Sequence, residues 1–163
     1  GGGGGACCDG GAYWGGAGGA GILNEGTITS LMNSGTILGG SGVNGAADAA
    51  GIVNRGNITT LTNMGVISGS VGIDNTSGSI ATLINAQGGD GLSAATTALT
   101  FKGTLVGSGS QPYLNYRTYV TSQSSYGQLY MQSVSGLMNF GIATGSPFTD
   151  ITGSNVEIGR AHV

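Results

Sequence analysis

The chain has 163 residues, of which 36 are glycine, four are Lys or Arg and seven are Asp or Glu, giving a net charge of −3. Its length suits one domain, but so much glycine is unusual for a globular protein. So few cations cannot neutralise a row of phosphates, and the apolar runs are too short to span a bilayer. Neither nucleic acid nor the membrane interior is therefore an expected partner.

Residues 1–20 form a glycine-rich N-terminal segment that contains the adjacent residues Cys7 and Cys8. A disulfide between neighbours would close a strained ring, and two thiolates rarely hold zinc, so free thiols are the simpler interpretation. Tyr13 and Trp14 are either a sugar-stacking platform or, more simply, side chains that pack on the repeats that follow. No metal and no cofactor is predicted.

One phrase, Gly-Ile-x-Asn-x-Gly-x-Ile-x-x-Leu-x-Asn-x-Gly-x-Ile-x-Gly, occurs at 21–39, at 51–69 and, with slippage, at 72–88. Residues 27–29 and 57–59 alternate polar and apolar side chains, which predicts short strands with one buried face. Frequent Gly and Asn oppose a helix. Because such units bury their apolar face by stacking, we expect an all-β fold, a single-stranded right-handed parallel β-helix (solenoid) with a C-terminal capping segment.

Each position of the phrase has an expected place in a coil. Asn and Gly should form the corners, because both tolerate the left-handed backbone region. Isoleucine and leucine should form inward columns, which pair Ile28 with Ile58, Leu31 with Leu61, and Ile37 with Ile67. The asparagines should form ladders of hydrogen bonds along the axis, one of Asn24, Asn54 and Asn75 and another of Asn33, Asn63 and Asn85.

Residues 41–50 lengthen the first repeat relative to the second. Insertions of this kind usually form loops that protrude from one corner of a solenoid. Val43, Asn44 and Asp48 are therefore the candidate binding residues of the repeats. The simpler alternative is a solvated Gly/Ala loop without a function.

After the repeats at 21–98, the strand-like stretches 99–106 and 113–120 are rich in aromatic and branched side chains. They predict heavier coils and a cap at 99–157, since the end of a solenoid otherwise exposes backbone and apolar surface. Residues 158–163 resemble the translation of a sequencing-library adapter. That tail, including His162, is excluded from the expected fold.

Residues 119–142 resemble the end of an autotransporter passenger domain, where a Tyr-Gly-Gln-Leu-like motif, here Tyr126, Gly127, Gln128 and Leu129, lies in the stable last coils. The repeats are similar to those of autotransporter adhesins, so the similar stretches cover about 21–141. The resemblance implies a bacterial type V secretion substrate, at the cell surface, in the outer membrane or secreted. Its expected partners are an outer-membrane translocator barrel in the same full-length chain and a glycan or cell-surface receptor.

Three departures qualify this resemblance: the adjacent cysteines, the lack of a following barrel and the lack of a leader. The chain is therefore interpreted as an internal, metagenomic fragment of a longer protein. The motif at 126–129 would act there as an autochaperone-like folding nucleus.

Three classes of function are compared: a structural or adhesive module, an enzyme acting on polysaccharide, and an ice-binding protein. A surface of Thr, Ser and Asn suits a structural stalk or adhesin. Some β-helices act on polysaccharides, but such chemistry needs paired carboxylates and the acidic residues here are scattered singly, so catalysis is not predicted. Ice binding needs a regular threonine row, yet Thr27 and Thr29 are followed by Asn57 and Thr59.

Overall fold

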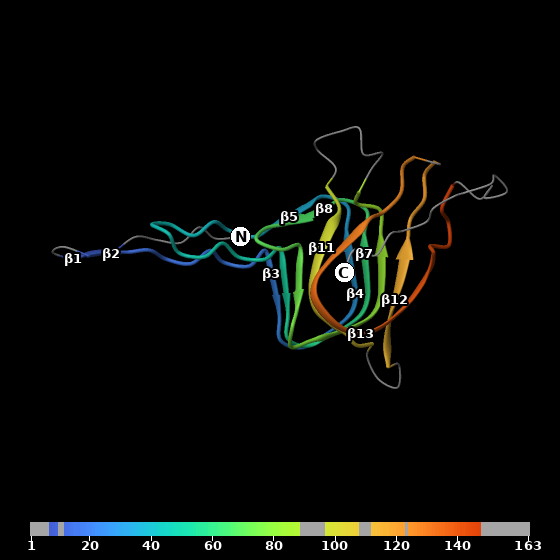
Figure 1. The fold of residues 1–163 in the computed structure, drawn as a ribbon, viewed down its shortest axis with the longest axis horizontal. Helices are drawn as coiled ribbons and strands as arrows, with labels where there is room; N and C mark the ends of the chain where they lie inside the picture. The colour runs from blue at the N-terminus through green and yellow to red at the C-terminus, as the bar shows by residue number, and fades with distance from the viewer. Residues whose placement is uncertain (1–6, 10–11, 89–96, 108–111, 123, 148–163) are drawn as a thin grey trace.

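The computed structural model describes residues 7–9, 12–88, 97–107, 112–122 and 124–147 (Figure 1). These residues form strands and loops without a helix, which confirms the predicted all-β class for this part of the chain. Accordingly, the described residues include no helix long and apolar enough to cross a bilayer. The predicted tail at 158–163 and residues 148–157 of the predicted cap lie outside the described residues.

Successive turns of chain supply the strands, and we refer to each turn as a coil. Coil 1 contains β3 (Ile22–Asn24), β4 (Thr27–Asn33) and β5 (Thr36–Leu38). Coil 2 contains β6 (Ile52–Asn54), β7 (Asn57–Asn63) and β8 (Val66–Ser68). Coil 3 contains β9 (Ile73–Asn75) and β10 (Ser79–Asn85), and coil 4 contains β11 (Leu99–Leu105) and β12 (Tyr113–Thr118). The last strand is β13 (Leu129–Ile142), and a separate antiparallel pair consists of β1 (Cys7–Asp9) and β2 (Ala12–Trp14).

Nine of these strands form one sheet in the order β3-β6-β9-β11-β13-β12-β10-β7-β4, and every neighbouring pair is parallel. The sheet folds back on itself through β13, because residues 129–136 lie beside β11 and residues 137–142 lie beside β12. β5 and β8 form a third side. The result is a nearly closed parallel sheet, compatible with a β-solenoid.

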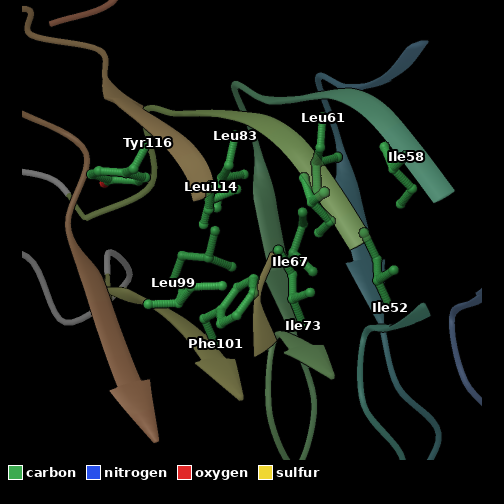
Figure 2. Packing of buried hydrophobic residues seen from close by; sticks show 12 residues of the cluster. Ile52, Ile58, Leu61, Ile67, Ile73, Leu83, Leu99, Phe101, Leu114 and Tyr116 are labelled. Atoms are coloured by element: carbon green, nitrogen blue, oxygen red, sulfur yellow. The ribbon is translucent and has the colours of Figure 1, made fainter. Parts of the chain in front are cut away.

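Apolar side chains line the inside of this sheet in columns (Figure 2). The register places Ile28 opposite Ile58, Leu31 opposite Leu61 and Ile37 opposite Ile67. The coil 2 members of these pairs are at most 1% exposed, whereas their coil 1 partners are only partly buried. Each fully buried Ile or Leu contributes about 1.5–3 kcal/mol to stability, so the middle of the stack is the most stabilised part.

Aromatic side chains replace the aliphatic ones in the later coils. The column that begins with Leu31 continues through Tyr116 to Phe140, whose ring centroids are 5.7 Å apart. Phe101 occupies the equivalent place on the other side and is fully buried. No strand of the described residues continues the third side beyond β8, and Phe101 and Tyr116 are both buried in coil 4.

The corner glycines are needed for a reason other than the predicted one. Neither the corner glycines nor the ladder asparagines have positive φ, so the prediction of left-handed corners was wrong. Instead, a Cβ on Gly56 would lie 2.0 Å from the carbonyl oxygen of Gly26 in the coil above. Gly65 lies as close to the carbonyl oxygen of Gly35. Successive corners therefore stack backbone on backbone, and only glycine leaves room for this contact.

This stacking predicts that the same glycine-to-alanine substitution is destabilising in coil 2 and nearly neutral in coil 1. Gly56→Ala should lower the free energy of unfolding by about 1–3 kcal/mol or more, because the corner must open to admit the methyl group. Gly26→Ala should change it by less than about 0.5 kcal/mol, since a Cβ at Gly26 meets nothing within 4 Å. Urea denaturation of both variants provides the comparison, and equal losses would contradict the stacking argument.

Candidate functional site

The first asparagine ladder runs along one corner of the coils. Asn24 Nδ2 donates to Asn54 Oδ1 at 2.7 Å, and Asn54 Nδ2 donates to Asn75 Oδ1 at 2.7 Å. Asn75 Nδ2 ends the ladder by donating to the carbonyl oxygen of Thr104 at 2.7 Å. All three amides are buried, so each bond forms where water cannot replace it. The ladder locks the axial register of the coils.

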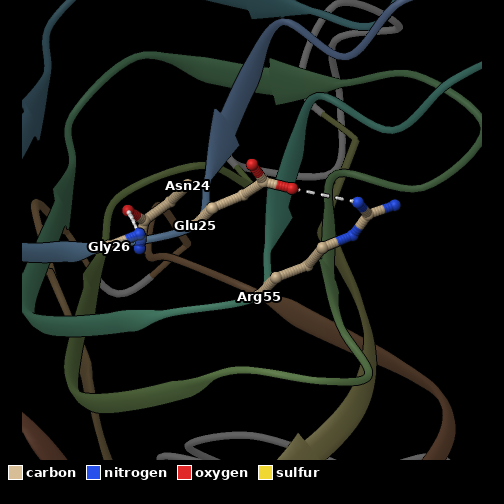
Figure 3. Close-up of polar contacts among 4 residues, drawn as sticks. All are labelled: Asn24, Glu25, Gly26 and Arg55. Atoms are coloured by element: carbon tan, nitrogen blue, oxygen red, sulfur yellow. Dashed lines mark hydrogen bonds and ion pairs between the residues drawn. The ribbon is translucent and has the colours of Figure 1, made fainter.

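The same asparagines also shape the corners (Figure 3). Asn24 Oδ1 accepts a hydrogen bond from the backbone N–H of Gly26 at 3.2 Å, which turns the chain between β3 and β4. Beside this turn, Arg55 Nη1 lies 3.2 Å from Glu25 Oε1 of the coil above. Both of these side chains are more than half exposed, and an exposed ion pair contributes about 0–1 kcal/mol. The corner is therefore held mainly by the amide.

The second ladder lies at the next corner. Asn33 Nδ2 donates to Asn63 Oδ1 at 2.8 Å, and Asn63 Nδ2 donates to Asn85 Oδ1 at 3.0 Å. Asn85 Nδ2 donates to the carbonyl oxygens of Gln87 and Gln128, each at 3.0 Å. This second ladder therefore ends at the motif that carries the resemblance to passenger domains.

Gln87 is an important residue that sequence reasoning missed. Its Oε1 accepts from the backbone N–H of Ile67 at 2.8 Å, and its Nε2 donates to the carbonyl oxygen of Ile67 at 3.3 Å. The Gln87 side chain thereby imitates a strand partner for β8. The available signal was the place where the phrase fails, because Asn85-Ala86-Gln87 replaces the Asn-x-Gly of the equivalent corners in coils 1 and 2.

The motif at 126–129 lies where the second ladder ends. Gly127 is buried, and its carbonyl oxygen accepts hydrogen bonds from Thr118 Oγ1 at 2.7 Å and from Tyr116 Oη at 3.2 Å. The backbone of Gln128 donates to the carbonyl oxygen of Gln87 at 2.8 Å and accepts from the N–H of Leu99 at 3.0 Å. The motif thus connects coils 3 and 4 to β13.

Tyr116 makes this junction sensitive to alkaline pH. Burial raises the pKa of its hydroxyl from 10.0 to about 12. Between these two values the unfolded chain loses the proton and the folded chain keeps it, so the free energy of unfolding should fall by about 1.4 kcal/mol per pH unit. Urea denaturation from about pH 9 to about pH 11.5 should show this loss in the wild type. Tyr116→Phe should remove this contribution, and an unchanged slope in that variant would contradict the assignment.

The insertion at 41–50 is a folded projection (Figure 1). Asn44 and Gly45 have φ of 53° and 81° and form its tight turn, closed by a bond from the Ala46 N–H to the Val43 carbonyl oxygen at 3.1 Å. Asp48 Oδ1 accepts from the N–H of Gly42 at 2.8 Å. Of the three candidate binding residues, Val43 and Asp48 thus hold the projection together, and Asn44 stands exposed at its tip.

Glycine-rich chain also packs along this projection. The N–H of Val43 donates to the carbonyl oxygen of Gly16 at 3.1 Å, and the N–H of Gly18 donates to that of Ala47 at 3.0 Å. A Cβ on Gly18 would lie 1.8 Å from the carbonyl oxygen of Gly40. Residues 15–19 and the insertion therefore form one tightly packed unit, because glycine lets their backbones touch.

The described carboxylates do not converge. Glu25 pairs with Arg55, Asp48 holds the projection, and Asp74 Oδ1 accepts from the N–H of Thr76 at 3.0 Å. The part of the chain that the structure describes holds no group of three or more His, Cys, Asp or Glu side chains placed to bind a metal ion. Outside that part lie His162 and the acidic residues Asp90, Asp150 and Glu157, and the side chains of β1 and β2 are likewise outside it.

No protein-family model matches this chain, and neither a curated protein nor a solved structure matches it significantly.

Proposed function

We propose that the chain is a right-handed parallel β-helix from the passenger of a bacterial autotransporter, with a structural and adhesive role at the cell surface or after secretion. The observation that carries this proposal is the parallel register, which is kept from coil 1 to β13. Because neighbouring coils are fixed by buried amides and apolar columns, the stack is a stiff support. Its outward positions are then free to contact other molecules.

A polar row on the outer face supports the adhesive part of the proposal. The register aligns five polar residues along the axis, namely Ser30, Thr60, Thr82, Asn115 and Asn139. Asn139 Nδ2 donates to Asn115 Oδ1 at 3.1 Å, so a hydrogen bond fixes the last two side chains of the row relative to each other. Closely spaced hydroxyls and amides without a charge suit hydrogen bonds to the hydroxyl groups of a glycan.

Binding to immobilised glycans and to cells tests this role. The chain should bind above an unrelated β-helix, and Thr60→Val with Thr82→Val should weaken binding several-fold, because valine keeps the shape and removes both hydroxyls. Thr36→Val on the third side is the matched control and should bind like the wild type. Binding no stronger than that of the unrelated β-helix would reject the adhesive role.

The proposal includes a translocator barrel in the same full-length chain, with the coils near 126–129 as the stable seed for folding. The contacts of the motif with both preceding coils support this placement. The reading frame that follows the coils decides the point. Alternating strands of about ten residues are expected there, and a frame without them would reject the barrel.

A further inference from the structure

Both ends of the stack leave strand edges without a partner among the described residues. β3 and β4 occupy the two ends of the nine-stranded order. At the other end of the stack, each half of β13 has a neighbour on one side only, β11 for residues 129–136 and β12 for residues 137–142. Free edges of this kind bind further strands unless charge, proline, a bulge or a covering segment protects them, and the one bulge here is at Ser133 of β13, which already pairs with β11 through it.

Protecting charges and prolines are missing from these strands. β3, β4 and β13 contain neither a charged residue nor a proline. Glu25, between β3 and β4, already pairs with Arg55 of coil 2. The projection leaves coil 1 after β5 and extends away from the strands of the stack (Figure 1). Nothing in the composition of the two ends therefore opposes their contact.

The apolar columns also end in partly exposed side chains. Leu61 is fully buried in the middle of its column, whereas Leu31 at one end is only partly buried and Phe140 at the other is 40% exposed. Likewise Ile22 begins a column that ends at Met131, and both are partly buried. The apolar side chains at the two ends are therefore of the kind that pack against each other between neighbouring coils inside the stack.

We propose that coil 1 of one copy stacks on β13 of a second copy, head to tail. β3 then lies parallel to residues 129–136 and β4 lies parallel to residues 137–142. Leu31 packs on Phe140 and Ile22 packs on Met131, which continues both columns in their existing register. Asn33 would then lie over Ile142, which offers no side-chain hydrogen bond. Its Oδ1 still has a partner, because it accepts from the N–H of Gly35 within coil 1.

Such a contact joins two different surfaces and does not close on itself, so repeated stacking extends the rod into a filament. The inference concerns the ends of the stack. It does not depend on the adhesive role, which uses the outer face, and it applies to a passenger that has been released from the proposed barrel.

Light scattering coupled to size exclusion tests the proposal with the full chain. The mass of the wild type should rise with concentration above the 15.8 kDa of one copy. Leu31→Lys blocks one end and Phe140→Lys blocks the other, so each variant alone should remain a monomer. An equimolar mixture should form a dimer that grows no further, since each partner supplies one intact end. Thr62→Lys is the control, because it adds the same charge on β7, which already has a strand partner on both sides, and it should assemble like the wild type.

Circular dichroism and thermal unfolding check that every variant is folded. A wild type of constant monomeric mass at all concentrations would overturn the proposal whatever the variants do, and it would mean that something other than a second copy covers these ends. Folded variants that stay monomeric when mixed, or that each assemble alone, would overturn it as well. If Leu31→Lys does not fold, Ile22→Ser blocks the same end for the mixing experiment.

Discussion

Gly127→Ala should lower the free energy of unfolding by about 1–3 kcal/mol or more, because the added methyl group overlaps packed backbone. A Cβ at this position would lie 1.8 Å from the carbonyl oxygen of Asn85 and 2.5 Å from its carbonyl carbon. Neither backbone can move away freely. The N–H of Gly127 donates to the carbonyl oxygen of Tyr119 at 3.0 Å, and its own carbonyl oxygen holds Tyr116 and Thr118.

Urea denaturation followed by near-UV circular dichroism of the tyrosines measures this loss. Gly35→Ala is the matched control, because a Cβ there meets nothing within 4 Å, and it should unfold within about 0.5 kcal/mol of the wild type. Refolding rates add a test of the folding nucleus. If residues 126–129 form early, Gly127→Ala slows folding in proportion to its lost stability, whereas a change confined to the unfolding rate would argue against the nucleus.

Asn63→Leu should lower the free energy of unfolding by about 3–5 kcal/mol, although leucine has nearly the shape of asparagine. Asn63 is fully buried and is the centre of the second ladder. Its Oδ1 accepts from Asn33 at 2.8 Å and from the N–H of Gly65 at 3.3 Å, and its Nδ2 donates to Asn85 and Gln87, each at 3.0 Å. Leucine removes four hydrogen bonds at once, and the three to Asn33, Asn85 and Gln87 are buried.

The control for this substitution is Asn139→Leu on the exposed outer row. Its amide makes one side-chain bond, to Asn115 Oδ1 at 3.1 Å, and water can replace that bond. The expected change is less than about 0.5 kcal/mol. Equal losses in the two variants would show that the buried ladder contributes no more than a surface amide.

Much of the architecture could be read from the phrase, because each repeat carries its own turns and strand lengths. Once Asn-x-Gly recurs at equivalent places, stacking puts like residues opposite one another. Leu31 faces Leu61 and Asn33 bonds to Asn63 for this reason. The steric reason for glycine at the corners was harder to infer, because the backbone that excludes a side chain at Gly56 belongs to another coil.

The candidate site depended more on contacts between distant segments. The Gln87 side chain bonds to the backbone of Ile67 in β8, 20 residues earlier in the chain. Its role is visible only once coil 3 is stacked on coil 2. The insertion projects from coil 1 as expected, and its role in binding stays a prediction. Only the structure shows that it packs on residues 16–18, with Asn44 exposed at its tip. Single-sequence reasoning lacks these contacts because they join residues that no local pattern relates.

By itself, the sequence determined the repeating strands, the inward columns and the pairing of the asparagines, because these follow from short-range periodicity. The tertiary structure alone decided that β13 belongs to both sides of the sheet, that Gly127 meets Asn85, and that no described strand pairs with the outer edges of β3, β4 and β13. The reason is physical. A strand's own residues set which of its faces is apolar, but the neighbours that cover that face, or leave it bare, are set by the packing of the whole chain.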